Sequence, residues 1–162
     1  MATIKTTHGD IKLELDEKNA PITVANFLEY ARSGHYAGTI FHRVIETFMI
    51  QGGGLDKDLR NVKTRAPIKN ESANGLSNKK YTVAMARTNV PDSATSQFFI
   101  NTSDNDFLDR ANASDGVGYA VFARVIEGQD VVDKIAKVKT TTRSPHANVP
   151  VDTIEILAVE VD

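Results

Sequence analysis

The sequence predicts an all-β protein, an antiparallel barrel or sandwich with helical caps near the two ends of the chain. Two observations carry this prediction. Short apolar or alternating segments recur along the chain, with turn residues between them. Helical periodicity occurs at only two places. The 162 residues contain no linker and no internal repeat, so we expect a single domain over residues 1–162.

The N-terminal segment predicts a β-hairpin. Residues Thr3 to Thr7 are rich in β-branched side chains, and His8-Gly9-Asp10 supplies a turn. After the turn, Ile11, Leu13 and Leu15 alternate with polar residues, as in a strand with one buried face.

A helix is predicted directly after this hairpin. Pro21 suits the first helical turn, and Gly34 stands where a glycine ends many helices. The apolar face that the helix should bury follows the 3.6-residue period: Val24, Phe27, Leu28 and Ala31.

The middle of the chain predicts strands around one long loop. Residues Thr39 to Gln51 are mostly apolar and β-prone. Gly52-Gly53-Gly54 allows a close approach of the backbone to a ligand, but a tight exit from strand to loop is the favoured interpretation. The polar stretch from Leu55 to Asn78 lacks periodicity and predicts a long surface loop, which in a small domain is more often functional than idle.

The second half of the chain predicts further strands and one helix. The expected strands are Tyr81–Ala86, Gln97–Asn101, Tyr119–Val125 and Thr153–Val161. The helix is expected over Gln129–Ala136, where Val131, Val132 and Ile135 form an apolar face. In the last strand the apolar phase slips between Ile156 and Leu157, which indicates a bulge or burial on both faces.

Composition excludes several classes of function. The formal net charge is −2 and no basic stripe occurs, so a nucleic-acid partner is not expected. The chain has no cysteine, its four histidines are scattered, and Asp104-Asn105-Asp106 lacks the later residues of a calcium loop. We therefore expect no metal and no cofactor. The N-terminus has no apolar signal region and no run is long enough to span a membrane, so a cytoplasmic location is expected.

The stretch from Phe41 to Gly54 carries the first functional signal. In an alternating strand Phe41, Arg43 and Ile45 share one face, so a permanently charged side chain lies among large apolar neighbours. For this segment alone, an arginine at the rim of a sheet with its charged end in solvent is the favoured interpretation. A second segment, Met85 to Asn101, weakens that interpretation, because it is another apolar strand pair that carries a lone glutamine, Gln97.

These residues resemble the cyclophilin family of peptidyl-prolyl cis/trans isomerases. The family pattern F-H-R-x-[IV]-x-x-F-M-x-Q-G-G matches without interruption from Phe41 to Gly53. Ala84–Arg87 and Ser96–Asn101 follow in the family's order and spacing. The similarity covers essentially the whole chain and is greatest to the short bacterial members of the peptidyl-prolyl isomerase B type. It implies a closed eight-stranded antiparallel β-barrel with two capping helices and an active groove on the outer wall.

The resemblance also implies a role for individual residues. By motif position, Arg43 is the catalytic arginine. The apolar pocket for the proline ring is implied at Phe48, Met49, Phe99 and Leu108. The main chain of the substrate is implied to be held by Gln51, Gln97 and the backbone of Ala86 and Arg87. Tyr119 stands where eukaryotic members have a pocket-lining histidine. Phe107 replaces a tryptophan associated with tight cyclosporin binding, which implies weak binding of that drug.

The function implied is rotation of X-Pro bonds in unfolded or flexible chains, which assists protein folding. Proline-containing peptides and unfolded proteins are the expected partners, and a monomer without a membrane or nucleic-acid partner is the expected state. A module that captures proline-containing chains, or a chaperone in which turnover is incidental, remains the alternative. It is ranked lower because the sequence keeps both the arginine and the pocket aromatics.

Overall fold

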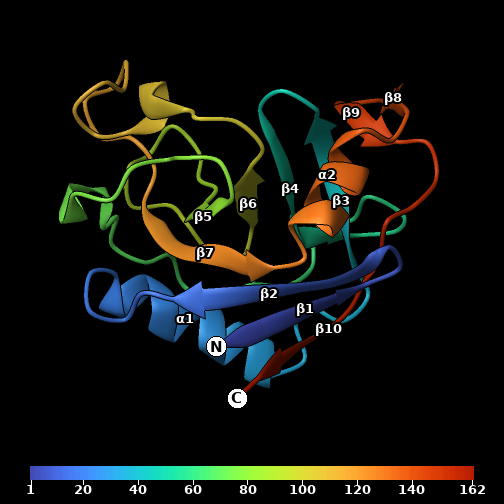
Figure 1. Ribbon diagram of the computed structural model, residues 1–162, viewed down its shortest axis with the longest axis horizontal. Coiled ribbons are helices and arrows are strands. Elements are labelled where there is room, and N and C mark those ends of the chain that lie inside the picture. The colour runs from blue at the N-terminus through green and yellow to red at the C-terminus, as the bar shows by residue number, and fades with distance from the viewer.

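Eight antiparallel strands wrap into a barrel with two helices packed against it, as a computed structural model of all 162 residues shows (Figure 1). The barrel strands are β1 (Ala2–Thr6), β2 (Gly9–Leu15), β3 (Thr39–Ile45), β4 (Met49–Asp56), β5 (Thr82–Met85), β6 (Phe98–Asn101), β7 (Val121–Glu127) and β10 (Ile156–Val161). The helices are α1 (Pro21–Arg32) and α2 (Gln129–Ala136). The predicted fold class is confirmed, and so are both helices.

The sheet closes almost completely on itself. Its strand order is β10-β1-β2-β7-β5-β6-β4-β3, so the two edge strands are β10 and β3. These edges meet over a short stretch, where Phe41 N–H donates to Ile154 O at 3.0 Å and Gly38 N–H donates to Ile156 O at 2.9 Å. Closure of this kind leaves little unpaired strand edge for other chains to pair with.

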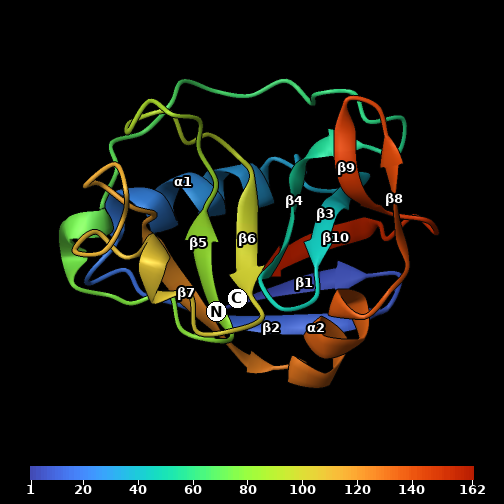
Figure 2. The same ribbon diagram turned by 90° about the horizontal axis from the view of Figure 1, so that it is seen from above.

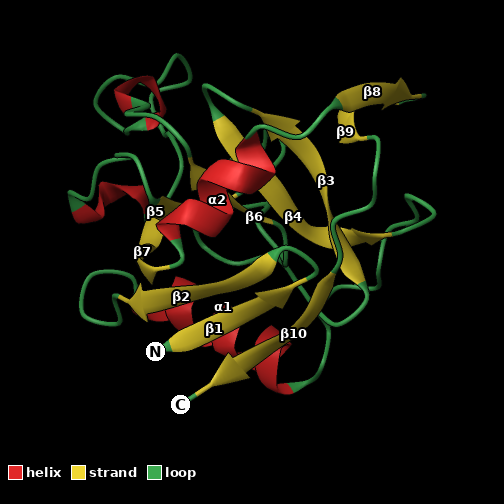
Figure 3. Cartoon of the chain, turned by 45° about the vertical axis from the view of Figure 1, so that its right-hand side comes forward, coloured by secondary structure: helices red, strands yellow, loops and turns green.

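The predicted N-terminal hairpin is confirmed, although Gly9 and Asp10 of the expected turn already belong to β2. The hairpin of β1 and β2 turns at Thr7 and His8, and β1 also pairs with β10, which places the two termini side by side (Figures 1 and 3). The predicted irregularity near Ile156 is a bulge, because Thr6 pairs with Ile156 while Lys5 pairs with Ala158. Leu157 is the extra residue and is half exposed, whereas Ile156 is fully buried.

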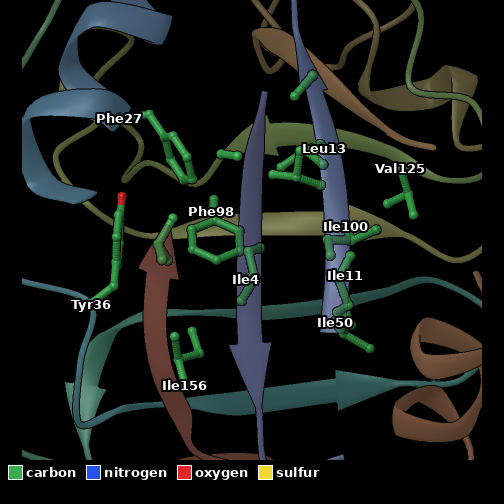
Figure 4. Close-up of a cluster of buried hydrophobic side chains, with 14 of the residues drawn as sticks. Ile4, Ile11, Leu13, Phe27, Tyr36, Ile50, Phe98, Ile100, Val125 and Ile156 are labelled. Atoms are coloured by element: carbon green, nitrogen blue, oxygen red, sulfur yellow. The ribbon is translucent and has the colours of Figure 1, made fainter. Parts of the chain in front are cut away.

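The barrel interior is a packed hydrophobic core. Ile4, Ile11, Leu13, Ile100 and Ile156 point inward from the strands, as Figure 4 shows, and all five are fully buried. A side chain of this size contributes roughly 1.5–3 kcal/mol when it is removed from water. Because side chains fill the interior, any binding site of the barrel has to lie on its outer wall.

Helix α1 adds aromatic side chains to this core. Val24, Phe27 and Ala31 are buried as predicted, while Leu28 is only half buried. Tyr30, which the periodicity did not single out, is buried in its place. The helix lacks a capping side chain of its own. The carboxylate of Glu71, from the long loop, instead accepts a 2.6 Å hydrogen bond from the backbone N–H of Thr23.

Helix α2 lies on the opposite side of the barrel from α1 (Figure 2). Val132 and Ile135 are buried against the core and Val131 packs beside them, which confirms the predicted apolar face. Neither helix combines the length and the hydropathy that crossing a bilayer requires.

Two strands outside the barrel were not predicted. β8 (Thr140–Arg143) and β9 (His146–Pro150) form a separate hairpin that lies beside β3 (Figure 3). All four residues of β8 are exposed, so the segment shows no alternation between apolar and polar residues. The long loop is confirmed, since residues 57–81 contain only one short helical turn at Ser72–Asn74.

The interpretation of the triple glycine as a strand exit is wrong. Strand β4 continues through Gly52, Gly53 and Gly54 to Asp56. The glycines are needed because neighbours approach closely: a Cβ at Gly53 would lie 2.8 Å from the Tyr36 ring and 2.9 Å from the Phe98 ring. One at Gly54 would collide with the side chain of Gln97. The run of glycines therefore reflects packing inside a strand.

We expect Gly53→Ala to lower the free energy of unfolding by about 1–3 kcal/mol more than Gly34→Ala does, because added volume in a packed core forces its neighbours apart. Both glycines have a positive φ, +89° and +77°, but nothing lies within 4 Å of a Cβ at Gly34. The comparison therefore separates crowding from backbone strain. Urea unfolding followed by circular dichroism measures both values. Equal losses in the two variants would contradict the crowding argument.

Candidate active site

A bulge in β3 turns Arg43 to the outside of the barrel. Phe41 pairs with Gly52 and Arg43 with Gln51, so His42 is an extra residue on β3. As a result Phe41 and Val44 both enter the core, while Arg43 lines a pocket on the outer wall. The expectation that Phe41 and Arg43 share a face is therefore wrong, because a bulge shifts the alternation by one residue.

The floor of this pocket is a second, smaller hydrophobic cluster, whose buried members are Met49, Ala84, Phe99, Leu108 and Val121. Strand alternation separates it from the core: Phe98 is fully buried inside the barrel, whereas Phe99 points outward and is 4% exposed. Met49 and Phe99 come from the adjacent strands β4 and β6. An apolar floor therefore forms on strands whose inner face already belongs to the core.

Buried asparagines hold the rim of the pocket. The side-chain amide of Asn105 donates to Phe48 O at 2.7 Å and to Asn101 Oδ1 at 2.8 Å, and Asn101 donates to Asn78 Oδ1 at 3.1 Å. All three asparagines are buried with partners, as polar groups in a core must be. This network fixes the turn that carries Phe48 against the short helical turn at Asp106–Leu108.

Phe107 comes from that turn and forms part of the rim. It is 58% exposed and its ring stacks on Phe48, with the ring centroids 5.7 Å apart. The guanidinium carbon of Arg43 lies 5.9 Å from the centroid of the same Phe48 ring. Phe48 thus stands between the arginine and Phe107.

Two glutamines lie next to Arg43. Gln51 donates from Nε2 to Gln97 Oε1 at 2.9 Å, which fixes the orientation of both amides. Gly54 leaves room for the Gln97 side chain, so the glycine run in β4 also shapes this part of the site. The pair leaves the second N–H of Gln51 free to donate to a bound molecule.

The pocket has a volume of about 130 Å³ and gathers residues that are far apart in the sequence. Its lining is Arg43, Phe48, Met49, Gln51, Ala86, Arg87, Phe99, Leu108 and Tyr119. These are nine of the residues singled out from the sequence. The other two, Gln97 and Phe107, lie beside the pocket and touch its lining through Gln51 and Phe48.

The two arginines of the pocket differ in their partners. Arg43 makes no salt bridge and no side-chain hydrogen bond within the protein, so its donors face the pocket unpaired. Arg87 bonds to Asp115 at 2.5 Å. Asp115 was not singled out from the sequence, where the turn residues Ser114-Asp115-Gly116 were its only signal.

His42 remains neutral beside this charge. It is 6% exposed, and burial together with His146 and Arg43 lowers the pKa of His42 to about 4. Its Nδ1 atom is buried without a hydrogen-bond partner.

No group of three or more acidic or histidine side chains is arranged around a metal position.

The outer wall of this antiparallel barrel carries an unpaired guanidinium beside an apolar pocket. Such a site is typical of a class of protein that binds an apolar ring next to a hydrogen-bond donor. The sequence model of the cyclophilin type peptidyl-prolyl cis-trans isomerase/CLD family matches residues 1–161. The chain belongs to this family and is a peptidyl-prolyl cis-trans isomerase.

Similar proteins agree with this assignment. The chain is 57% identical to peptidyl-prolyl cis-trans isomerase cyp18 of Streptomyces antibioticus, and the match covers 99% of both chains. It is 52% identical to peptidyl-prolyl cis-trans isomerase B of Escherichia coli, again over 99% of both. A Cryptosporidium parvum cyclophilin crystallised in the presence of the dipeptide Ala-Pro superposes with a TM-score of 0.79 at 27% identity, covering 99% of this chain and 98% of that one.

We expect His42 to make the protein less stable in mild acid. The depressed pKa means that the unfolded state binds a proton more readily, so this contribution is complete above pH 6.5 and is lost as the pH falls toward 4. Between pH 7 and pH 5 the loss amounts to about 2 kcal/mol. Urea unfolding of wild type and His42→Gln at both pH values measures it.

The variant should lose less stability than wild type over this interval, whereas a control, His8→Asn, should lose as much as wild type. His8 lies in the β1–β2 turn, away from the pocket. An identical pH dependence for wild type and His42→Gln would contradict the argument.

Proposed function

We propose that Arg43 is the catalytic group of this isomerase. An X-Pro bond resists rotation because the nitrogen lone pair is delocalised into the carbonyl group, with a barrier of ~18–20 kcal/mol for peptide bonds in general. The cis and trans forms differ by only ~1 kcal/mol, so the enzyme has to change the rate and not the equilibrium. Without a catalyst the exchange takes roughly 10–100 s.

The transition state differs from both planar forms at the prolyl nitrogen. When the bond is twisted, conjugation is lost and the lone pair becomes available as an acceptor. A donor aimed at this nitrogen stabilises the transition state more than either ground state, which is the condition for catalysis. The unpaired guanidinium of Arg43 is such a donor, and it remains charged at any physiological pH.

The apolar floor supports this role in two ways. Met49, Phe99 and Leu108 form a surface on which a proline ring fits, and each of them is at least nine-tenths buried. Excluding water also lowers the local dielectric, which strengthens the hydrogen bond from Arg43. Removing about 5 kcal/mol from the barrier corresponds to more than three powers of ten in rate.

Next to the floor, two backbone groups of the protein are open to the main chain of a substrate. The C=O of Ala86 and the N–H of Arg87 form no hydrogen bond within the protein, so both are free to pair with an extended peptide. Gln51 on β4 and Gln97, which directly precedes β6, offer further amide groups. Holding one side of the bond allows the other side to rotate.

We propose further that the substrates are X-Pro bonds of unfolded or flexible chains, and that the enzyme assists protein folding as a monomer in the cytoplasm. A site that grips one ring and a few backbone groups has little means of selecting a sequence. Cyclosporin should bind weakly, because Phe107 offers no indole N–H to a ligand. The net charge of −2 gives no reason to expect a nucleic-acid partner.

We expect Arg43→Ala to lower the exchange rate of an Ala-Pro peptide at least tenfold, because the donor to the prolyl nitrogen is lost. Arg43→Lys should give an exchange rate between those of wild type and Arg43→Ala, since lysine keeps the charge without the planar fork. Exchange NMR measures the rate, and circular dichroism checks the fold. Arg60→Ala is the matched control, because Arg60 is an exposed arginine whose side chain makes no hydrogen bond. Full activity of Arg43→Ala would exclude the mechanism and favour a module that only binds.

We also expect the rate to be nearly constant between about pH 6 and pH 9. Arginine does not titrate in this range, and a pKa of about 4 keeps the adjacent His42 neutral throughout. The same exchange measurement at several pH values checks this, with the peptide alone as the blank. A bell-shaped profile would indicate acid–base catalysis instead.

A further inference from the structure

The side chain of Arg87 is fully occupied within the protein. It is 3% exposed, and its three nitrogens bond to Asp115 Oδ2 at 2.5 Å, Gly118 O at 2.9 Å and Thr88 O at 2.9 Å. Arg43, across the same pocket, has no such partner. The Arg87 guanidinium therefore holds parts of the protein together, and only its backbone remains free for a substrate.

What Arg87 holds is a wall of the pocket. Its guanidinium carbon lies 4.6 Å from the centroid of the Tyr119 ring. The same ring packs edge-on against Phe99, with centroids 5.6 Å apart. Tyr119 is thus fixed between the charged group of Arg87 and the aromatic floor, and it is only half buried because its remaining surface faces the pocket.

The backbone beneath Tyr119 is fixed as well. Tyr119 N–H donates to Leu108 O at 3.0 Å. Gly118 has a φ of +75°, and a Cβ there would lie 2.5 Å from Leu108 O, so only glycine fits this approach. Tyr119 is therefore attached to the pocket floor through its main chain, while the position of its ring depends on Arg87.

Asp115 uses its two carboxylate oxygens for different purposes. Oδ1 accepts hydrogen bonds from Val117 N–H at 2.9 Å and Gly118 N–H at 3.1 Å, and Oδ2 accepts from Arg87. These backbone bonds and the Arg87 guanidinium hold the pKa of Asp115 well below its usual range. One oxygen shapes the turn and the other orients Arg87, so the two functions are separable by substitution.

We propose that Asp115 and the Arg87 side chain are positioning residues that hold Tyr119 as a wall of the proline pocket and thereby set the affinity for the proline ring. The proposal rests on the function proposed above, in which this pocket takes the ring. It assigns binding to the Asp115–Arg87–Tyr119 unit and rotation to Arg43. The unit should therefore affect KM far more than kcat.

Asp115→Asn is the most selective test. The amide keeps an oxygen for the turn bonds but replaces the acceptor for Arg87 with an N–H group that repels the guanidinium. We expect KM for an Ala-Pro peptide to rise about three- to tenfold while kcat changes less than twofold. Arg87→Lys should act in the same direction, because an ammonium cannot make three bonds and stack at once. Asp58→Asn, an exposed carboxylate without a hydrogen bond, controls for the change in charge.

A double-mutant cycle separates positioning from a general loss of structure. Tyr119→Ala alone should raise KM at least as much as Asp115→Asn. Adding Asp115→Asn to Tyr119→Ala should then change KM less than twofold, because the unit acts only through the tyrosine ring. A purely structural role for Asp115 would give the same increase in both backgrounds and would overturn the proposal.

The outcomes distinguish the two proposals. An unchanged KM in Asp115→Asn or in Tyr119→Ala, together with loss of activity in Arg43→Ala, would end this inference and leave the proposed function intact. Wild-type activity of Arg43→Ala would instead remove the proposed function itself.

Discussion

One extra residue in β3 determines that Arg43 lies on the outer wall of the barrel and not in its core. Without the bulge at His42, regular alternation would place Phe41 and Arg43 on one face, and either a phenylalanine would leave the core or a charge would enter it. A lone arginine inside a barrel without a partner is strongly unfavourable. The bulge satisfies both requirements, because Phe41 and Val44 remain in the core while Arg43 faces outward. The cost is His42, which is buried, neutral and lacks a partner at Nδ1.

The outer wall offers two guanidinium groups, and their partners divide the work between them. Arg87 is tied to Asp115, Gly118 and Thr88, so it behaves as part of the framework. Arg43 has no acidic neighbour to neutralise it, so a hydrogen bond to a bound acceptor stabilises its guanidinium. Unpaired donors held in a fixed place need little reorganisation during a reaction, which is how preorganised electrostatic catalysis operates.

Much of the fold could be predicted from local pattern, and the exceptions have physical causes. The hairpin of β1 and β2 and both helices follow from periodicity and turn residues. The slip in apolar phase after Ile156 left open a bulge or burial on both faces, and the structure shows the bulge. β8 has no buried face, so no pattern marks it. The interpretation of the triple glycine as a strand exit is wrong because the neighbours that require glycine there, Tyr36 and Phe98, come from distant parts of the chain. The residues around the pocket were found through a family resemblance, whereas Asp115 acts through Arg87 and left no motif.

The position of the pocket outside the barrel suits a reaction that is a rotation. An interior site would enclose its ligand, but this interior is filled by the core, and a polypeptide could not thread through it. On the outer wall a long chain can lie across the pocket with both ends free. In the proposed mechanism, the apolar floor and the open backbone positions at Ala86 and Arg87 hold one side of the bond, and the other side turns in solvent. A site of this kind needs no nucleophile, no metal and no proton transfer. In the proposed mechanism, the specificity of the site extends only as far as the ring and the few backbone groups it contacts.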